Sequence, residues 1–176
     1  MLERPITKTI YFITGASGVG KTTLVENLMN KHENKSWYFL HFDTIGVPSS
    51  AEMQRDFGSP PAWQKAKTFE WIGQLVNDYQ SEKIFFEGQV NLQFIVEGFA
   101  KHNFENYQIF LVDCSEKEME CRLTFGRSQP ELVTEPMKKW LQYLRAQAKE
   151  SGVPILDTTK LSPEEMVRGF ENAIGL

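Results

Sequence analysis

Residues 13–24 read ITGASGVGKTTL, where glycines, a lysine and a threonine fall at the spacing G-x-x-x-x-G-K-[ST]. The glycines let the backbone form a tight loop whose N–H groups point inward at an anion, and the helix that opens at its end adds its dipole. The lysine reaches the outer phosphates of a nucleotide, and the threonine hydroxyl ligates Mg²⁺. The stretch therefore predicts a nucleotide-binding loop formed by Gly15, Ala16, Ser17, Gly18, Val19, Gly20, Lys21, Thr22 and Thr23.

Strands and helices alternate along the rest of the chain. Buried strands are expected at short runs rich in β-branched and aromatic residues, at 8–14, 37–43, 83–88, 107–114 and 153–159. Helical patterns cover 21–32, 62–79, 91–102, 115–123, 135–150 and 162–174. Because this alternation requires crossover connections, it predicts a parallel sheet covered by helices on both faces. Turn formers and charge make 45–61 and 125–135 the least regular spans.

Composition limits the class of protein. With 176 residues, 41% of them hydrophobic, one domain over 1–176 is expected. A net charge of −4 gives no electrostatic reason to expect a nucleic acid or an anionic membrane as partner. No secretion signal or membrane-spanning run is apparent, which favours a cytoplasmic protein with a small-molecule partner.

The cysteines and histidines point to neither a disulfide nor a metal centre. Cys114 and Cys121 are seven positions apart, which on a helix separates them by roughly 10 Å along the axis. That distance is too long for a disulfide. The three histidines are scattered without ligand spacing, so we expect two reduced thiols.

Carboxylates end two of the predicted strands, at the edge where the phosphate loop opens. Asp43 would take a proton from an attacking hydroxyl or hold a magnesium-bound water, and its alternative role is to form a turn. Glu87 would orient Mg²⁺ or water, or accept hydrogen bonds from a substrate, with the Gln89 amide beside it. Local turn formation or helix capping is the alternative for both Glu87 and Gln89.

Arginines mark a predicted lid over about 122–136. Arg122 and Arg127 lie five positions apart at a helix-to-loop junction, where a mobile loop would close guanidinium groups over the phosphates. A single surface arginine is otherwise simply solvated.

The predicted substrate-binding region spans about 44–80. Arg55 would reach an anionic group on the acceptor, or it is a solvated helical arginine. The aromatic residues Trp63, Phe69 and Trp71 are interpreted as a helix-packing face rather than a substrate contact.

Taken together, these residues resemble the P-loop small-molecule kinases of the adenylate, shikimate and gluconate kinase type. The resemblance rests on ITGASGVGKTT, the aspartate after the second strand, the arginine-bearing lid and the closing ILDTTKLSPEEM. It implies a three-layer α/β/α fold, with a five-stranded parallel sheet in the order 2-3-1-4-5 and a small lid. It also implies ATP as donor and Mg²⁺ as cofactor, places Asp157, Thr158 and Thr159 near the adenine, and makes Asp43 the base and Arg122 and Arg127 the lid clamps.

Two departures from the family's patterns concern the acceptor. The second aspartate common in shikimate and gluconate-type kinases is Ile45 here, and the adenylate-type Asp-Gly-Pro-Arg run is replaced by Glu87-Gly88-Gln89-Val90. The favoured function is transfer of the γ-phosphate of ATP to a small acceptor, with Lys21, Asp43 and the two lid arginines as catalytic groups. The alternative is a P-loop ATPase or nucleotide-dependent regulatory module without an acceptor, as monomer or dimer.

Overall fold

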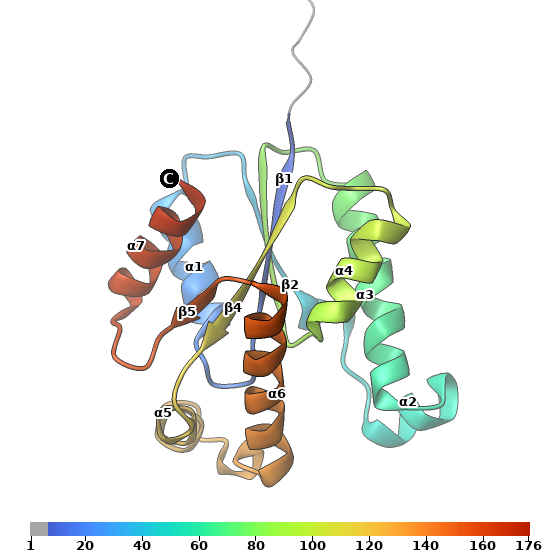
Figure 1. The fold of residues 1–176 in the computed structure, drawn as a ribbon, viewed down its shortest axis with the longest axis vertical. Helices are drawn as coiled ribbons and strands as arrows, with labels where there is room; N and C mark the ends of the chain where they lie inside the picture. Colours follow the sequence, from blue (N-terminus) through green and yellow to red (C-terminus); the bar gives the residue numbers. More distant parts are fainter. Residues whose placement is uncertain (1–6) are drawn as a thin grey trace, which may run out of the picture.

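Five strands form one parallel sheet at the centre of the computed structural model, which describes residues 7–176 (Figure 1). The strands are β1 (Thr9–Thr14), β2 (Tyr38–His41), β3 (Lys83–Gly88), β4 (Tyr107–Asp113) and β5 (Ile155–Asp157). Their spatial order is β2-β3-β1-β4-β5, so β1 lies in the middle and the order implied by the family resemblance is confirmed. The helices and shorter turns are α1 (Lys21–Lys31), η1 (Phe42–Ile45), α2 (Ser50–Phe57), α3 (Pro60–Asn77), α4 (Leu92–Lys101), α5 (Glu116–Cys121), η2 (Arg122–Gly126), η3 (Pro130–Leu132), α6 (Glu135–Ser151) and α7 (Pro163–Ile174).

Helices cover both faces of the sheet, as the alternation of elements predicts. Figure 1 shows α1 and α7 together on one side and α3 and α4 on the other. Successive side chains of a strand point to opposite faces, so Ile10 and Phe12 join the core under α3, α4 and α6, whereas Tyr11 and Ile13 join the core under α1 and α7. The two cores hold the carboxyl end of β1, and with it the phosphate loop, in the middle of the molecule.

Most of the helices begin with a polar residue whose side chain caps the first turn. The residues that cap α2 to α7 in this way are Ser49, Ser59, Asn91, Ser115, Thr134 and Ser162. Such a cap satisfies one of the N–H groups that the first turn of a helix leaves without a partner. Helix α1 differs, because Gly20 at its N-cap has no side chain to offer and the first N–H groups face the loop.

The structure corrects two predicted boundaries near the substrate-binding region. The span 45–61 is not irregular, because α2 occupies Ser50–Phe57 between a capping box at Ser49 and a left-handed glycine at Gly58. Only Met53 of α2 is buried, so the short helix has no apolar periodicity to reveal it. The second strand ends at His41, two residues earlier than predicted, and the chain then enters the 3₁₀ turn η1.

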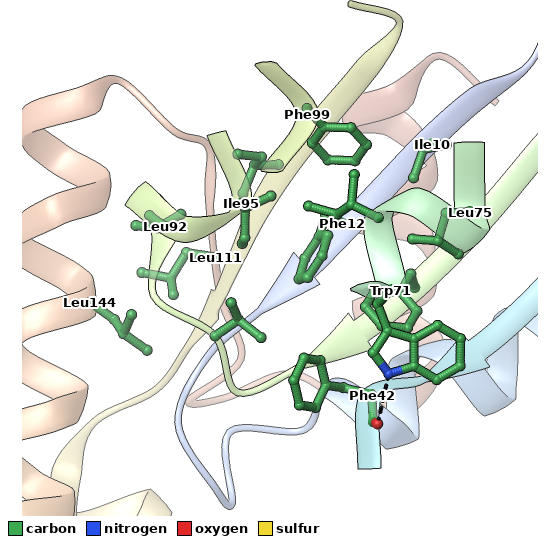
Figure 2. Packing of buried hydrophobic residues seen from close by; sticks show 14 of the residues in the cluster. Ile10, Phe12, Phe42, Trp71, Leu75, Leu92, Ile95, Phe99, Leu111 and Leu144 are labelled. Atoms are coloured by element: carbon green, nitrogen blue, oxygen red, sulfur yellow. Dashed lines mark hydrogen bonds between the residues drawn. The ribbon is translucent and has the colours of Figure 1, made fainter. Parts of the chain in front are cut away.

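Figure 2 shows what fixes that turn: Phe42 of η1 packs into the core, and the indole N–H of Trp71 donates to its carbonyl oxygen over 3.1 Å. A Cβ on Gly88 would lie 2.6 Å from the Cβ of Phe42, so the end of β3 permits this close approach only as glycine. The residue before Asp43 in the chain, Phe42, is therefore fixed by the core, and this fixes the backbone position of Asp43. Over residues 7–176 no helix combines the length and hydrophobicity needed to cross a membrane.

The two free thiols provide a test of this packing. Burial raises the pKa of the Cys114 thiol, just after β4, to about 11, whereas Cys121 is exposed on α5. Because the thiolate is the reactive form, we predict that at pH 8 a chromogenic disulfide reagent titrates one thiol rapidly and the second only after unfolding. In Cys121→Ser the rapid phase should be absent; a rapid phase that persists would contradict the buried placement of Cys114.

Candidate functional site

The loop between β1 and α1 has the backbone geometry of an anion cradle. Gly18 and Gly20 have φ of +80° and +103°, in the region that favours glycine. A Cβ on Gly15 would collide with the carbonyl oxygen of Val112, and one on Gly18 would lie 2.9 Å from a side-chain carbon of Leu123. The loop is thus packed tightly against β4 and η2, while its N–H groups and those of the uncapped first turn of α1 are left for a ligand.

The back of this loop is braced by two polar side chains. The carbonyl oxygen of Val19 accepts from the Thr158 hydroxyl over 2.7 Å and from the Arg122 guanidinium over 3.0 Å. Arg122 also donates to both oxygens of Thr158 and pairs with Glu118 over 2.8 Å. The carbonyl group of Val19 therefore has two hydrogen-bond donors, Arg122 at the start of η2 and Thr158 in the segment after β5.

This brace gives two predicted site residues a supporting role. Thr158 is completely buried and its side chain supports the loop; a contact of its backbone with an adenine stays a prediction. Arg122 is engaged at the base of the lid and is not free to close over the phosphates. Asp157 is exposed, and its hydrogen bonds from Thr159 lower the pKa of its carboxyl; its contact with a nucleotide base remains a prediction.

Four charged groups converge at the mouth of the loop. Lys21 is buried, and its ammonium group donates to the carbonyl oxygen of Ala16 over 2.9 Å. Burial lowers the pKa of Lys21; the carboxylates of Glu87 and Asp43 oppose this shift, and the positive charge of Arg127 adds to it. The charges of the predicted catalytic residues Asp43 and Arg127 thus act on Lys21, and Arg127 itself is exposed in the segment after η2.

Glu87 links the loop to the neighbouring strand. Its Oε1 accepts from the Thr22 hydroxyl over 3.1 Å and lies 2.8 Å from Nδ1 of His41. The sheet register aligns His41 with Glu87, which is why the two side chains meet. Among residues 7–176 there is no cluster of three or more His, Cys, Asp or Glu that could hold a metal ion. Thr22 and Glu87 nevertheless fit Mg²⁺, which prefers oxygen ligands and completes its shell with phosphates and water.

A pocket of about 950 Å³ opens beside this cluster. Asp43 and Gln89 line it, as predicted for substrate-binding residues, together with residues of η1, α2, α3, α4 and α6. Glu87 does not line the pocket and instead contacts Thr22 of α1. The predicted contact from Arg55 is not supported: its exposed guanidinium pairs with Asp56 over 2.6 Å and does not line the pocket.

Sequence reasoning missed two residues of this region. Trp63, interpreted as a packing residue, is buried and also lines the pocket. His41 showed no signal in the sequence because its partner Glu87 is 46 residues away. Only the parallel register of β2 against β3, which pairs His41 with Glu87, brings the two side chains together.

The fold of this chain is shared with solved structures of several small-molecule kinases. The fold is similar to a shikimate kinase from Acinetobacter baumannii in complex with shikimate (TM-score 0.64, 12% identity, 96% of this chain and 94% of that one). It is also similar to a sugar kinase from a Janibacter species (TM-score 0.65, 17%, 96% and 95%) and to a deoxyadenosine kinase from M. mycoides with bound dATP (TM-score 0.61, 15%, 96% and 100%). The chain has the fold of the P-loop small-molecule kinases. No family model matches the sequence, and no curated protein matches it by sequence.

Mutation can distinguish the bracing role of Arg122 from the role predicted for Arg127. In Arg122→Ala the Val19 carbonyl and Thr158 lose a charged donor, so we predict a loss of about 1–3 kcal/mol in the free energy of unfolding, measured by urea denaturation, with weaker ATP binding. Arg127→Ala should leave the unfolding midpoint unchanged, because its side chain is exposed. Equal stability of the two variants would contradict the bracing role of Arg122.

His41 is predicted to orient Glu87. In His41→Ala, Glu87 loses the ring nitrogen 2.8 Å from its carboxylate. The gain in nucleotide affinity that Mg²⁺ provides, measured by calorimetry, should fall about tenfold, because loss of a residue that orients a metal ligand commonly weakens metal binding by that much. His41→Asn, whose amide donates from a similar position, should recover part of the effect. His102→Asn serves as the control, because His102 packs against Gly73. Unchanged Mg²⁺ dependence in His41→Ala would refute the assignment.

Proposed function

We propose that the protein is an ATP-dependent phosphotransferase that moves the γ-phosphate to a hydroxyl group of a small molecule held in the pocket beside Asp43. One observation carries the proposal: Asp43 lines the pocket and also acts electrostatically on Lys21 of the phosphate loop. In this proposal a single carboxylate serves both the donor's phosphates and the acceptor in the pocket. A nucleotide hydrolase has no need for such a pocket.

The donor side is built from the loop and its neighbours. The N–H groups of the loop and of the first turn of α1 bind the phosphates, and Lys21 neutralises the outer ones. Thr22 and Glu87 would hold Mg²⁺, which supplies neutralisation of the charge on the phosphate oxygens when it is bound. His41 fixes the carboxylate of Glu87 in this position.

The acceptor side depends on Asp43 and the lid. Asp43 orients the acceptor's hydroxyl and takes its proton as the oxygen attacks the γ-phosphorus. Arg127, exposed on the lid near Lys21, stabilises the negative charge that spreads over the transferred group. Gln89 offers a donor and an acceptor to the bound molecule from the loop after β3.

Release of ADP from ATP and Mg²⁺ distinguishes this proposal from its alternative. We expect ADP release to rise at least tenfold over the acceptor-free rate when pools of hydroxylated metabolites, grouped by chemical class, are added. An equal rate with and without every pool would instead support an ATPase or a nucleotide-dependent regulatory module.

The role of Asp43 has its own test. Asp43→Asn keeps the shape but removes the base, so we predict a loss of transfer of about 10²–10⁴-fold with ATP affinity within about threefold of wild type, measured by coupled ADP assay and calorimetry. The matched control is Asp56→Asn, which removes a carboxylate that lies outside the pocket. Transfer by Asp43→Asn at the wild-type rate would show that another group accepts the proton.

A further inference from the structure

We propose that the acceptor is an uncharged hydroxylated compound that carries a planar ring, bound between aromatic side chains of the pocket. This inference rests on the proposed phosphotransferase function and adds the chemical class of its substrate. It follows from three properties of the pocket: its walls, its charge and its free hydrogen-bonding groups.

Aromatic rings form two walls of the pocket. On the first, Phe42 of η1 and Trp63 of α3 pack edge to face, with ring centroids 6.0 Å apart. On the second, Trp140 and Tyr143 of α6 stack with centroids 5.5 Å apart. Aromatic rings prefer offset-stacked or edge-to-face contact with another ring, so these walls favour a ligand that carries a ring of its own. A linear polyol has no such face to present.

The charge of the pocket disfavours an anionic acceptor. Its lining contains one carboxylate, Asp43, and one ammonium group, on the exposed Lys139. Sites that bind phosphate or carboxylate groups typically use the bidentate guanidinium of arginine. Within the part of the chain that the structure describes, no arginine lines the pocket. Arg55 pairs with Asp56, and Arg145 of α6 pairs with Asp113 below the phosphate loop.

The hydroxyl group of Tyr143 retains a proton for a ligand. Its oxygen accepts from the side-chain amides of Asn91 over 3.2 Å and Gln147 over 3.0 Å, which leaves its own proton to be donated, and Tyr143 lines the pocket. Gln64 uses both ends of its amide on the backbone of residues 89 and 91, and so fixes the segment from which the Gln89 side chain enters the pocket. A ring with a carbonyl oxygen or ring nitrogen matches these groups.

Binding to the protein saturated with Mg²⁺ and a non-hydrolysable ATP analogue tests the class directly. Calorimetry should show that at least one nucleoside, among adenosine, guanosine, cytidine and thymidine, binds at least tenfold more tightly than its own 5′-monophosphate and than shikimate or gluconate. Occupying the nucleotide site with the analogue ensures that the nucleosides report on the pocket. A monophosphate or carboxylated polyol that binds as tightly as the best nucleoside, or a panel in which no nucleoside binds, would overturn the inference.

Two variants test the contacts. Tyr143→Phe removes the donated proton and should weaken binding of the best nucleoside three- to tenfold, whereas Lys139→Ala should change it less than twofold. Lys149→Ala is the matched control, because it removes an exposed charge of the same helix outside the pocket. Thermal melting verifies that each variant is folded. A loss of tenfold or more in Lys139→Ala, or none in Tyr143→Phe, would contradict the proposed mode of binding.

The same compounds in the ADP assay separate this inference from the function on which it rests. If shikimate, gluconate or a monophosphate stimulates ADP release and the nucleosides do not, the phosphotransferase stands and the proposed class is wrong. If no compound or metabolite pool raises ADP release above the acceptor-free rate, the phosphotransferase itself fails, whichever compounds bind.

Discussion

The hydrogen bonds to the carbonyl group of Val19 make the rest of the site possible. A loop that presents bare N–H groups to a phosphate exposes its carbonyls on the other side, and a carbonyl buried without a partner costs about 1–3 kcal/mol. Here the Thr158 hydroxyl and the Arg122 guanidinium satisfy that oxygen from behind. The front of the loop can therefore remain unsatisfied until a ligand arrives, as can the first turn of α1, which has no side-chain cap.

The same brace ties three distant segments together. Thr158 follows β5, Arg122 begins η2 at the base of the lid, and both meet on the phosphate loop after β1. Arg122 is held there by its hydrogen bonds, whereas Arg127 lies in the exposed segment after η2. One arginine of the pair thus serves as an anchor and the other remains exposed near Lys21.

The features that the sequence predicts are formed by residues close together in the chain, and most of those it misses are contacts between residues far apart in the chain. The phosphate loop was predictable because its residues are contiguous, and the five strands because each is a local apolar run. The strand order came from resemblance to a family and is confirmed. The contact between His41 and Glu87, and the burial of Thr158 under the loop, depend on the register of strands far apart in the chain. The short helix α2 escaped because a mostly exposed helix leaves little apolar periodicity.

Asp43, in the turn η1 just after β2, illustrates how the core positions a surface residue in this fold. It is exposed, yet Phe42 before it is buried against Gly88 and bonded to Trp71 (Figure 2). The position of its backbone is therefore set by the core and not by the loop that follows. Positioning of the reacting groups supplies much of the catalysis of phosphoryl transfer, which asks little covalent chemistry of the protein. In the proposed phosphotransferase, a carboxylate whose backbone is held by the core beside the pocket would meet that requirement, and the exposed segment after η2 would add Arg127.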